Sequence, residues 1–303
     1  MTSFRTVLGI PGMLRSIHKM FYKIRDPKTF AAPPNISIVD HLMSGLAVFG
    51  LKCPSLLDYD TKRSDEVVSQ NLRDLYLVSS PPSDTYLRER LDEVNPASLR
   101  PAFKKMFAHF QRGKGLEKFE FLDGYIIISG DGTGHFSSGK VSCCHCCKKE
   151  LSNGSISLIC EVLSHFALKQ FSIPKGKEIN FSWVTNIKIT QDNAFTIMRG
   201  GRSRWKIENE TFNTIKNLGY NFEHNYGHGK KYLSTVFGML MMLAFLLDQI
   251  QEICCTLYKK SKTRLRTYRS LWEHIRVLFQ RIVLNNWENF YLMLAQEKSL
   301  NTS

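Results

Sequence analysis

The chain has 303 residues, enough to bury the core of one large or two ordinary domains, and its hydrophobic content of 43% excludes a disordered chain. It carries 41 Lys and Arg against 27 Asp and Glu, a formal net charge of +14, which suits a polyanionic partner such as nucleic acid or an acidic membrane surface. Eight cysteines without a secretory signal argue against a disulfide framework, so we expect a cytoplasmic protein.

Residues 1–118 show a helical pattern that prolines interrupt repeatedly, which predicts several short helices joined by tight connections. The stretch "SPPSDTYLRERLDEV" illustrates it. Ser83 can cap a helix that follows Pro82, and apolar residues then recur at helical spacing. We therefore predict a helical N-terminal module over residues 1–118.

The periodicity changes after residue 118. The run Tyr125 to Ile128 in "GYIIISGDG" predicts a buried strand, with Asp131 just past its end. The following segment predicts a hairpin that turns at Asn153 and Gly154. From Thr190 onward the pattern is helical again. The predicted fold class is α+β, with a second domain over residues 119–303.

One long apolar run, Val236 to Leu247, lies in the helical C-terminal part. Its twelve residues are fewer than the roughly 18 that a membrane span needs, and Asp248 follows directly. We interpret it as a buried core helix and expect no membrane association.

A cluster of cysteines has the spacing of a zinc site. Cys144, Cys147, Cys160 and His165 fit the usual separation of ligands. Cysteine is also a small buried hydrophobe in many proteins, and Cys160 lies in an apolar run, so core packing is the simpler interpretation. A structural zinc would make this hairpin a zinc ribbon in a non-enzymatic regulator.

The stretch "RSRWKIENETFNTIKNLGYNFEHNYGHGKKY", residues 202–232, combines cations, a carboxylate and a glycine-rich loop. On a helix Arg204 and Glu208 are neighbours four residues apart, and Lys216 follows two turns later. A surface helix with ion pairs would show the same spacing. A carboxylate framed by cations also suits the handling of a phosphodiester near a metal ion.

The stretches "SGDGTGHFSS" and "MRGGRSRWKIENETFNTIKNLGYNFEHNYGHGKKYLSTVFGMLMMLAFLLDQIQ" resemble DDE transposases of bacterial insertion sequences. The N-terminal "LMSGLAVFGLKCPSLLDYD" is similar to the same family. The resemblance implies an abbreviated ribonuclease-H-like mixed sheet within residues 119–303. It also implies that the N-terminal module contacts DNA ends.

The resemblance also assigns roles to single residues. Asp131 and Glu208 correspond to catalytic carboxylates that hold Mg²⁺ or Mn²⁺ for attack on DNA phosphodiesters. Arg204 and Lys216 correspond to the basic residues of the family's signature helix. Together with Arg202, Lys230 and Lys231, which we expect to contact DNA phosphates through their charge, they are the predicted DNA-binding residues. The sequence departs from the family signature in having Gly201 where a tyrosine is usual.

The second catalytic aspartate of this family has no counterpart here. Asp192 is the only aspartate between Asp131 and Glu208, and it belongs by resemblance to the start of the last helical segment. We infer an internal deletion and expect DNA cleavage and strand transfer to be impaired. The alternative is an active Mg²⁺-dependent transposase that uses Asp192. The expected partners are transposon-end inverted repeats and a second copy in a homodimer, in a bacterial cytoplasm.

Overall fold

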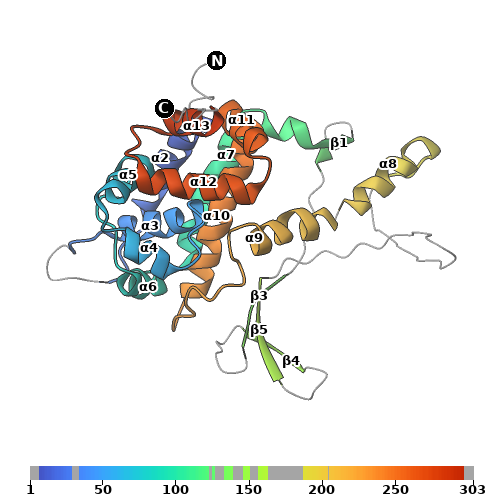
Figure 1. Ribbon diagram of the computed structural model, residues 1–303. Helices are drawn as coiled ribbons and strands as arrows, with labels where there is room; N and C mark the ends of the chain where they lie inside the picture. The colour runs from blue at the N-terminus through green and yellow to red at the C-terminus, as the bar shows by residue number, and fades with distance from the viewer. Residues whose placement is uncertain are drawn as a thin grey trace. The chain divides into compact units, whose positions relative to one another are not determined.

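The computed structural model describes residues 7–28, 34–122, 125–126, 133–138, 146–150, 156–162, 187–203 and 205–296. The chain divides into two compact units, Met1–Gly115 with Asn217–Ser303, and Leu116–Lys216. We call the first the helical unit. Figure 1 shows that the helices at both ends of the chain build this unit together. This division differs from the expected boundary at residue 118, because the C-terminal helices pack with the N-terminal ones.

The predicted α+β class with a ribonuclease-H-like mixed sheet is wrong, because the protein is all-α in its architecture. The described strands are confined to residues 120–162, and they pair only antiparallel. A mixed sheet needs parallel pairs as well. The physical core is formed by helices that pack on helices.

The first part of the helical unit consists of short helices, as predicted. They are α2 (Ile10–Phe21), α3 (Ile38–Gly50), α4 (Leu56–Lys62), α5 (Glu66–Tyr76), α6 (Asp84–Asp92), η1 (Pro96–Leu99) and α7 (Arg100–Arg112). Side chains cap several of them. Ser37, Ser55, Asp65 and Ser83 each accept a hydrogen bond from the backbone N–H three residues later. The predicted helix start at Ser83 is confirmed.

The second part of the unit is α10 (Leu233–Cys254), α11 (Thr256–Leu265), α12 (Tyr268–Arg281) and α13 (Trp287–Ala295). α10 is long and apolar enough to cross a membrane by length and composition. In this structure it packs against α3, where Gly45 lets the Leu240 side chain approach closely. The predicted core position of residues 236–247 is confirmed by their burial, with Val236, Leu240 and Met241 fully buried.

The other unit contains short elements. They are η2 (Gly115–Phe119), β1 (Glu120–Leu122), β2 (Tyr125–Ile126), β3 (Thr133–Ser138), β4 (Cys146–Glu150), β5 (Ile156–Val162), α8 (Gln191–Arg202), η3 (Ile207–Phe212) and α9 (Asn213–Asn217). β4 and β5 pair antiparallel, which fits the predicted hairpin. The run predicted as a buried strand from Tyr125 does form a strand at Tyr125–Ile126, but Ile126 is 40% exposed, so its predicted burial is wrong. Ile127 and Ile128 lie outside the described residues.

A buried ion pair joins the two parts of the helical unit. Lys52, just past α3, is fully buried, and its Nζ lies 2.6 Å from Asp248 Oδ2 on α10. The same Nζ donates to the Gly50 carbonyl at 3.0 Å. Its ammonium also lies 4.3 and 4.2 Å from the ring centroids of Tyr220 and Trp272. These contacts replace the hydration that the cation loses on burial.

The Asp248 carboxylate has further partners. The Tyr220 hydroxyl donates to the oxygen that Lys52 contacts, and the Gln251 amide donates to the other at 3.4 Å. The Tyr291 hydroxyl then donates to Gln251. Because α13 supplies Tyr291, this polar network reaches from the end of α3 to the last helix.

Asn71 on α5 fixes the chain between α12 and α13. Its amide nitrogen donates to the carbonyl oxygens of Phe279 and Ile282, each at 2.8 Å. Its amide oxygen accepts from the backbone N–H of Leu284 at 2.8 Å. The side chain is fully buried, so these bonds satisfy backbone groups that water does not reach.

The buried pair gives a stability prediction. Lys52→Met leaves the Asp248 carboxylate buried without its cation, so we expect a loss of about 3 to 5 kcal/mol in the free energy of unfolding. The double variant Lys52→Met, Asp248→Asn removes the uncompensated charge and keeps an acceptor for Tyr220, so it should recover a large part of the loss. Urea denaturation of wild type, both single variants and the double variant measures the coupling. If the two single substitutions changed the free energy of unfolding additively in the double variant, the ion pair would not contribute as described.

Candidate functional site

The structure divides the predicted site stretch between the two units. Arg202 and Lys216 lie in the unit 116–216, whereas Lys230 and Lys231 lie in the helical unit. Asp131 and Arg204 fall outside the described residues, and only the backbone of Glu208 is described. The pairing of Asp131 with Glu208 around a metal ion therefore stays a prediction.

The backbone around Glu208 is unusual. Residues Ile207–Phe212 form a π-helical segment between α8 and α9. Such segments are rare and occur frequently at functional sites. Lys206 Nζ lies 4.0 Å from a carboxylate oxygen of Glu210, and both side chains are strongly exposed. This neighbouring pair is the kind of surface ion pair that the spacing of the stretch also predicted, and it contributes little stability.

Two of the residues predicted to contact DNA lie on helices of this unit. Arg202 is the last residue of α8 and is exposed, and Lys216 on α9 is half-buried. Trp205, between them in the chain, is 57% exposed. Asp192 lies in the first turn of α8, next to a capping box that Thr190 and Asn193 form. An acid in the first turn stabilises a helix by its charge, which accounts for Asp192 without catalysis.

The zinc candidates fall partly within the described strands. Cys147 lies in β4 and Cys160 in β5, where Cys160 is opposite Cys146 and Cys147 is opposite Ile159. Cys144 and His165 lie outside the described residues. Within the residues that the structure does describe, no group of three metal-ligating side chains forms.

The loop Gly227–Tyr232 is the best-defined part of the predicted site. The Asp92 carboxylate, at the end of α6, accepts four backbone hydrogen bonds from the start of α10 and the residues before it. The donors are the N–H groups of Lys230 at 2.8 Å, Lys231 at 2.9 Å, Tyr232 at 2.9 Å and Leu233 at 3.0 Å. Asp92 thus caps α10 from another helix.

This capping explains one glycine of the loop. Gly229 has φ +68°, and a Cβ at this position would lie 2.3 Å from Asp92 Oδ1. Only glycine allows both the backbone angle and the approach of the carboxylate. The glycine in the loop that the sequence suggested for phosphate handling is therefore explained by the capping of α10.

The charge of Asp92 depends on the same contacts. Burial opposes its ionisation, but the four backbone N–H groups outweigh burial and hold its pKa below the ordinary value of 3.8. The helix N-terminus next to it also favours the anion.

The two lysines of the loop differ in their surroundings. Lys231 Nζ lies 2.6 Å from Glu93 Oε2, whereas the side chain of Lys230 is exposed and makes no ion pair with any described residue. The contact with Glu93 also raises the pKa of Lys231. Lys230 is thus the cation of this loop that is open to an anionic ligand.

Comparison with known protein families, with curated proteins and with solved structures finds no match for this chain.

The capping of α10 gives a second prediction. Gly229→Ala should cost roughly 1 to 2 kcal/mol or more, because alanine disfavours the left-handed backbone and its methyl group meets the Asp92 carboxylate. Gly238→Ala is the matched control, since a Cβ at Gly238 meets nothing within 4 Å in the middle of α10. There alanine should stabilise the helix by up to about 1 kcal/mol. Thermal unfolding compares the two, and equal effects would argue against the capped loop.

The acid dependence of the cap is a third prediction. Because the pKa of Asp92 is lowered on folding, its contribution to stability is present above the unfolded value of 3.8 and is lost as the pH falls through the lower folded value. The difference in stability between wild type and Asp92→Asn should therefore shrink only below the ordinary aspartate value. A constant difference down to the acid transition would show that the Asp92 charge contributes nothing.

Proposed function

We propose that the chain is a DNA-binding protein of the DDE transposase lineage whose cleavage and strand transfer are impaired. The proposal rests on the resemblance of the stretches around Asp131 and residues 198–251, and on the net charge of +14. Its proposed partners are transposon-end inverted repeats and a second copy of the chain, in a bacterial cytoplasm. The resident ion would be Mg²⁺ or Mn²⁺, held by Asp131 and Glu208.

The observation that carries the binding part is the loop at the start of α10. Asp92 fixes its backbone through four hydrogen bonds, and Lys230 extends from it into solvent. A cation on a fixed backbone can contact a phosphate with little additional loss of conformational entropy. Phosphate contacts position a protein on DNA without reading its sequence.

Lys216 and Arg202 support the same function from the other unit. Both lie on helices of the segment 191–217, and Trp205 in the same segment exposes a large aromatic ring. Exposed aromatic rings among cations are typical of surfaces that stack on unpaired bases. A zinc-ribbon regulator is the alternative, which stoichiometric zinc in the purified protein would support.

Salt-dependent binding is the fourth prediction. We expect affinity for a DNA duplex to fall at least about tenfold between roughly 50 and 200 mM salt, as two phosphate contacts would give. Lys230→Ala should weaken binding to all sequences alike and more than Lys231→Ala, because Glu93 already neutralises Lys231. Fluorescence anisotropy measures both. An affinity that does not change with salt would remove the electrostatic basis of the proposal.

Impaired cleavage is the fifth prediction. Two-metal catalysis needs carboxylates that fix both ions, and a missing ligand leaves the second Mg²⁺ weakly bound. We expect wild type to nick supercoiled DNA with Mg²⁺ or Mn²⁺ no faster than Asp131→Ala, Asp192→Ala or Glu208→Ala. Efficient nicking by wild type that Asp192→Ala abolishes would make Asp192 the third ligand and the chain an active enzyme.

A further inference from the structure

The second half of α11 and the turn that leads into α12 carry the densest run of positive charge in the described chain. The eleven residues from Lys259 to Arg269 contain six cations and no acid. We call this segment the basic turn. On α11 the residues Tyr258 and Ser261 are buried, so the helix exposes the opposite side. The cations exposed there are Lys259, Lys260, Arg264, Arg266 and Arg269.

The acid next to the basic turn does not neutralise these cations. Glu252 on α10 is engaged by Lys262 and by the Tyr268 hydroxyl, which donates to it at 2.6 Å. Lys262 is the one half-buried cation of the segment. Lys262 and Glu252 neutralise each other, so Glu252 does not neutralise the exposed cations. Lys260, Arg266 and Arg269 make no side-chain hydrogen bond or ion pair with any described residue.

Arg266 occupies a backbone position that disfavours it. It follows the last residue of α11 with φ 63° and ψ −44°, outside the usual left-handed region for residues other than glycine. The Thr267 N–H donates to the Leu265 carbonyl at 2.7 Å, so Arg266 is the central residue of a γ-turn with positive φ, which is rare and strained. A strained arginine whose side chain is exposed indicates a function for that side chain.

Arg269 also stands against the local electrostatic preference. It lies in the first turn of α12, which contains no acidic residue. The N-terminus of a helix carries partial positive charge, so a cation there is unfavourable. Arg266 thus stands where glycine would be more stable, and Arg269 stands where an acidic residue would be more stable. Positions where the residue conflicts with the local preference are often functional.

Arg264 is held in place by the fold. Its Nη1 donates to the Leu294 carbonyl on α13 at 2.8 Å. A guanidinium group has five N–H donors, so the others remain for a ligand. Lys259 is held as well, because its Nζ donates to the Ile253 carbonyl at 2.9 Å. Cations held in place in this way are suited to contact phosphate oxygens.

We propose that the basic turn is a contact surface for the phosphate backbone of double-stranded DNA. The proposal rests on the proposed DNA-binding function and adds a surface distinct from the loop at Lys230. An acidic membrane is the weaker partner, because none of the exposed large hydrophobic residues lies between Thr256 and Arg269. A helix that lies on a membrane buries an apolar face in it.

The decisive variant is Arg266→Gly, because it separates function from stability. Glycine accepts a positive φ, so the thermal unfolding midpoint should stay or rise, while duplex binding should weaken by about five- to tenfold. The slope of log affinity against log salt should fall by about 0.9 for the lost contact. Arg266→Gln keeps the Cβ and removes the charge, and it should weaken binding equally. Unchanged binding in both would overturn the proposal.

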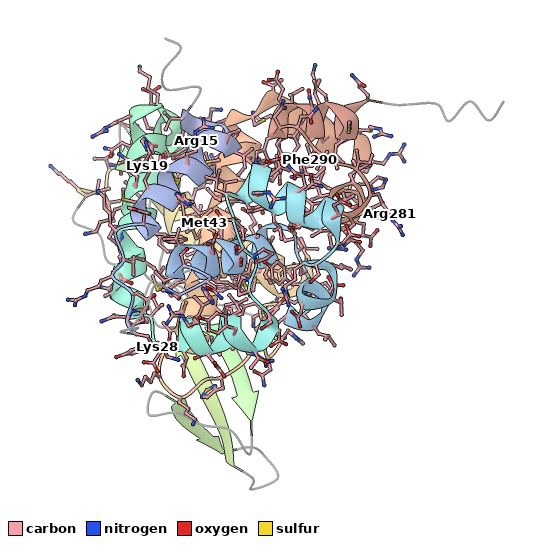
Figure 2. All side chains as sticks on the ribbon, turned by 90° about the vertical axis from the view of Figure 1, so that its left-hand side faces the viewer. Arg15, Lys19, Lys28, Met43, Arg281 and Phe290 are labelled. Atoms are coloured by element: carbon pink, nitrogen blue, oxygen red, sulfur yellow. The ribbon has the colours of Figure 1, made fainter. Side chains whose placement is uncertain are left out.

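A matched pair of triple variants excludes a general effect of net charge. Lys260→Gln, Arg266→Gly, Arg269→Gln removes three charges from the basic turn. Arg15→Gln, Lys19→Gln, Lys28→Gln removes three exposed charges elsewhere on the helical unit, at positions labelled in Figure 2. The first should weaken binding of a duplex of about 25 base pairs by at least about a hundredfold at low salt, and the second much less. Equal losses would overturn the proposal.

Three comparisons distinguish failure of the proposed function from failure of the proposed surface. If the full-length wild type binds no duplex at low salt, the proposed function itself is wrong. If it binds and only Lys230→Ala weakens it, the function stands and the basic turn is not its surface. Co-sedimentation with phosphatidylserine vesicles is the third arm, and vesicle binding that the basic-turn variant alone abolishes, with duplex binding intact, would assign the surface to membranes.

Discussion

The helical unit depends on one buried ion pair between parts of the chain 196 residues apart. Lys52 lies just past the end of α3, and Asp248 lies within α10. The aromatic rings of Tyr220 and Trp272 cover the ammonium group of Lys52. Each of these partners comes from a different segment, so the pair forms only when all of them are in place. Losing either charge leaves the other buried without its counter-ion, which makes the arrangement cooperative.

This pair also shows why the apolar part of the core could be predicted from the sequence, whereas the buried ion pair within it could not. The apolar run from Val236 to Leu247 was correctly predicted as a core helix, since its burial follows from its composition. Asp248 was interpreted as the end of the run, yet the helix continues to Cys254 with Asp248 inside it. A charged residue after an apolar run usually marks solvent. Its buried partner lies far away in sequence, where no local pattern shows it.

The prediction of the α+β fold class was wrong for a related reason. The run of β-branched residues at Tyr125 has the local preference of a buried strand, but burial requires neighbours that the sequence does not name. In the structure β2 pairs with β1 alone in the described part of the chain, and Ile126 stays exposed. The helix starts at Ser83 and Thr190 could be predicted, because a cap is a local interaction. The loop at Gly229 was recognised as special, but its cause, Asp92, lies on another helix.

Two of the cations that follow a helix with positive φ, Lys52 and Arg266, differ in what surrounds them. Lys52 follows α3 with φ 57°, and its cation is drawn inward by Asp248 and two aromatic rings, so the interior compensates the backbone strain. Arg266 follows α11 with φ 63°, and its cation points to no described partner. The strain at Lys52 is compensated by folding. At Arg266 the backbone is held by hydrogen bonds from its own N–H to the Lys262 carbonyl at 2.9 Å and from the Thr267 N–H to the Leu265 carbonyl at 2.7 Å, whereas the side chain makes no hydrogen bond or ion pair with any described residue. Because strained backbone of this kind clusters at functional sites and the surrounding turn holds it in place, the exposed Arg266 side chain with its neighbouring cations is the part of this helix end that is available to a ligand.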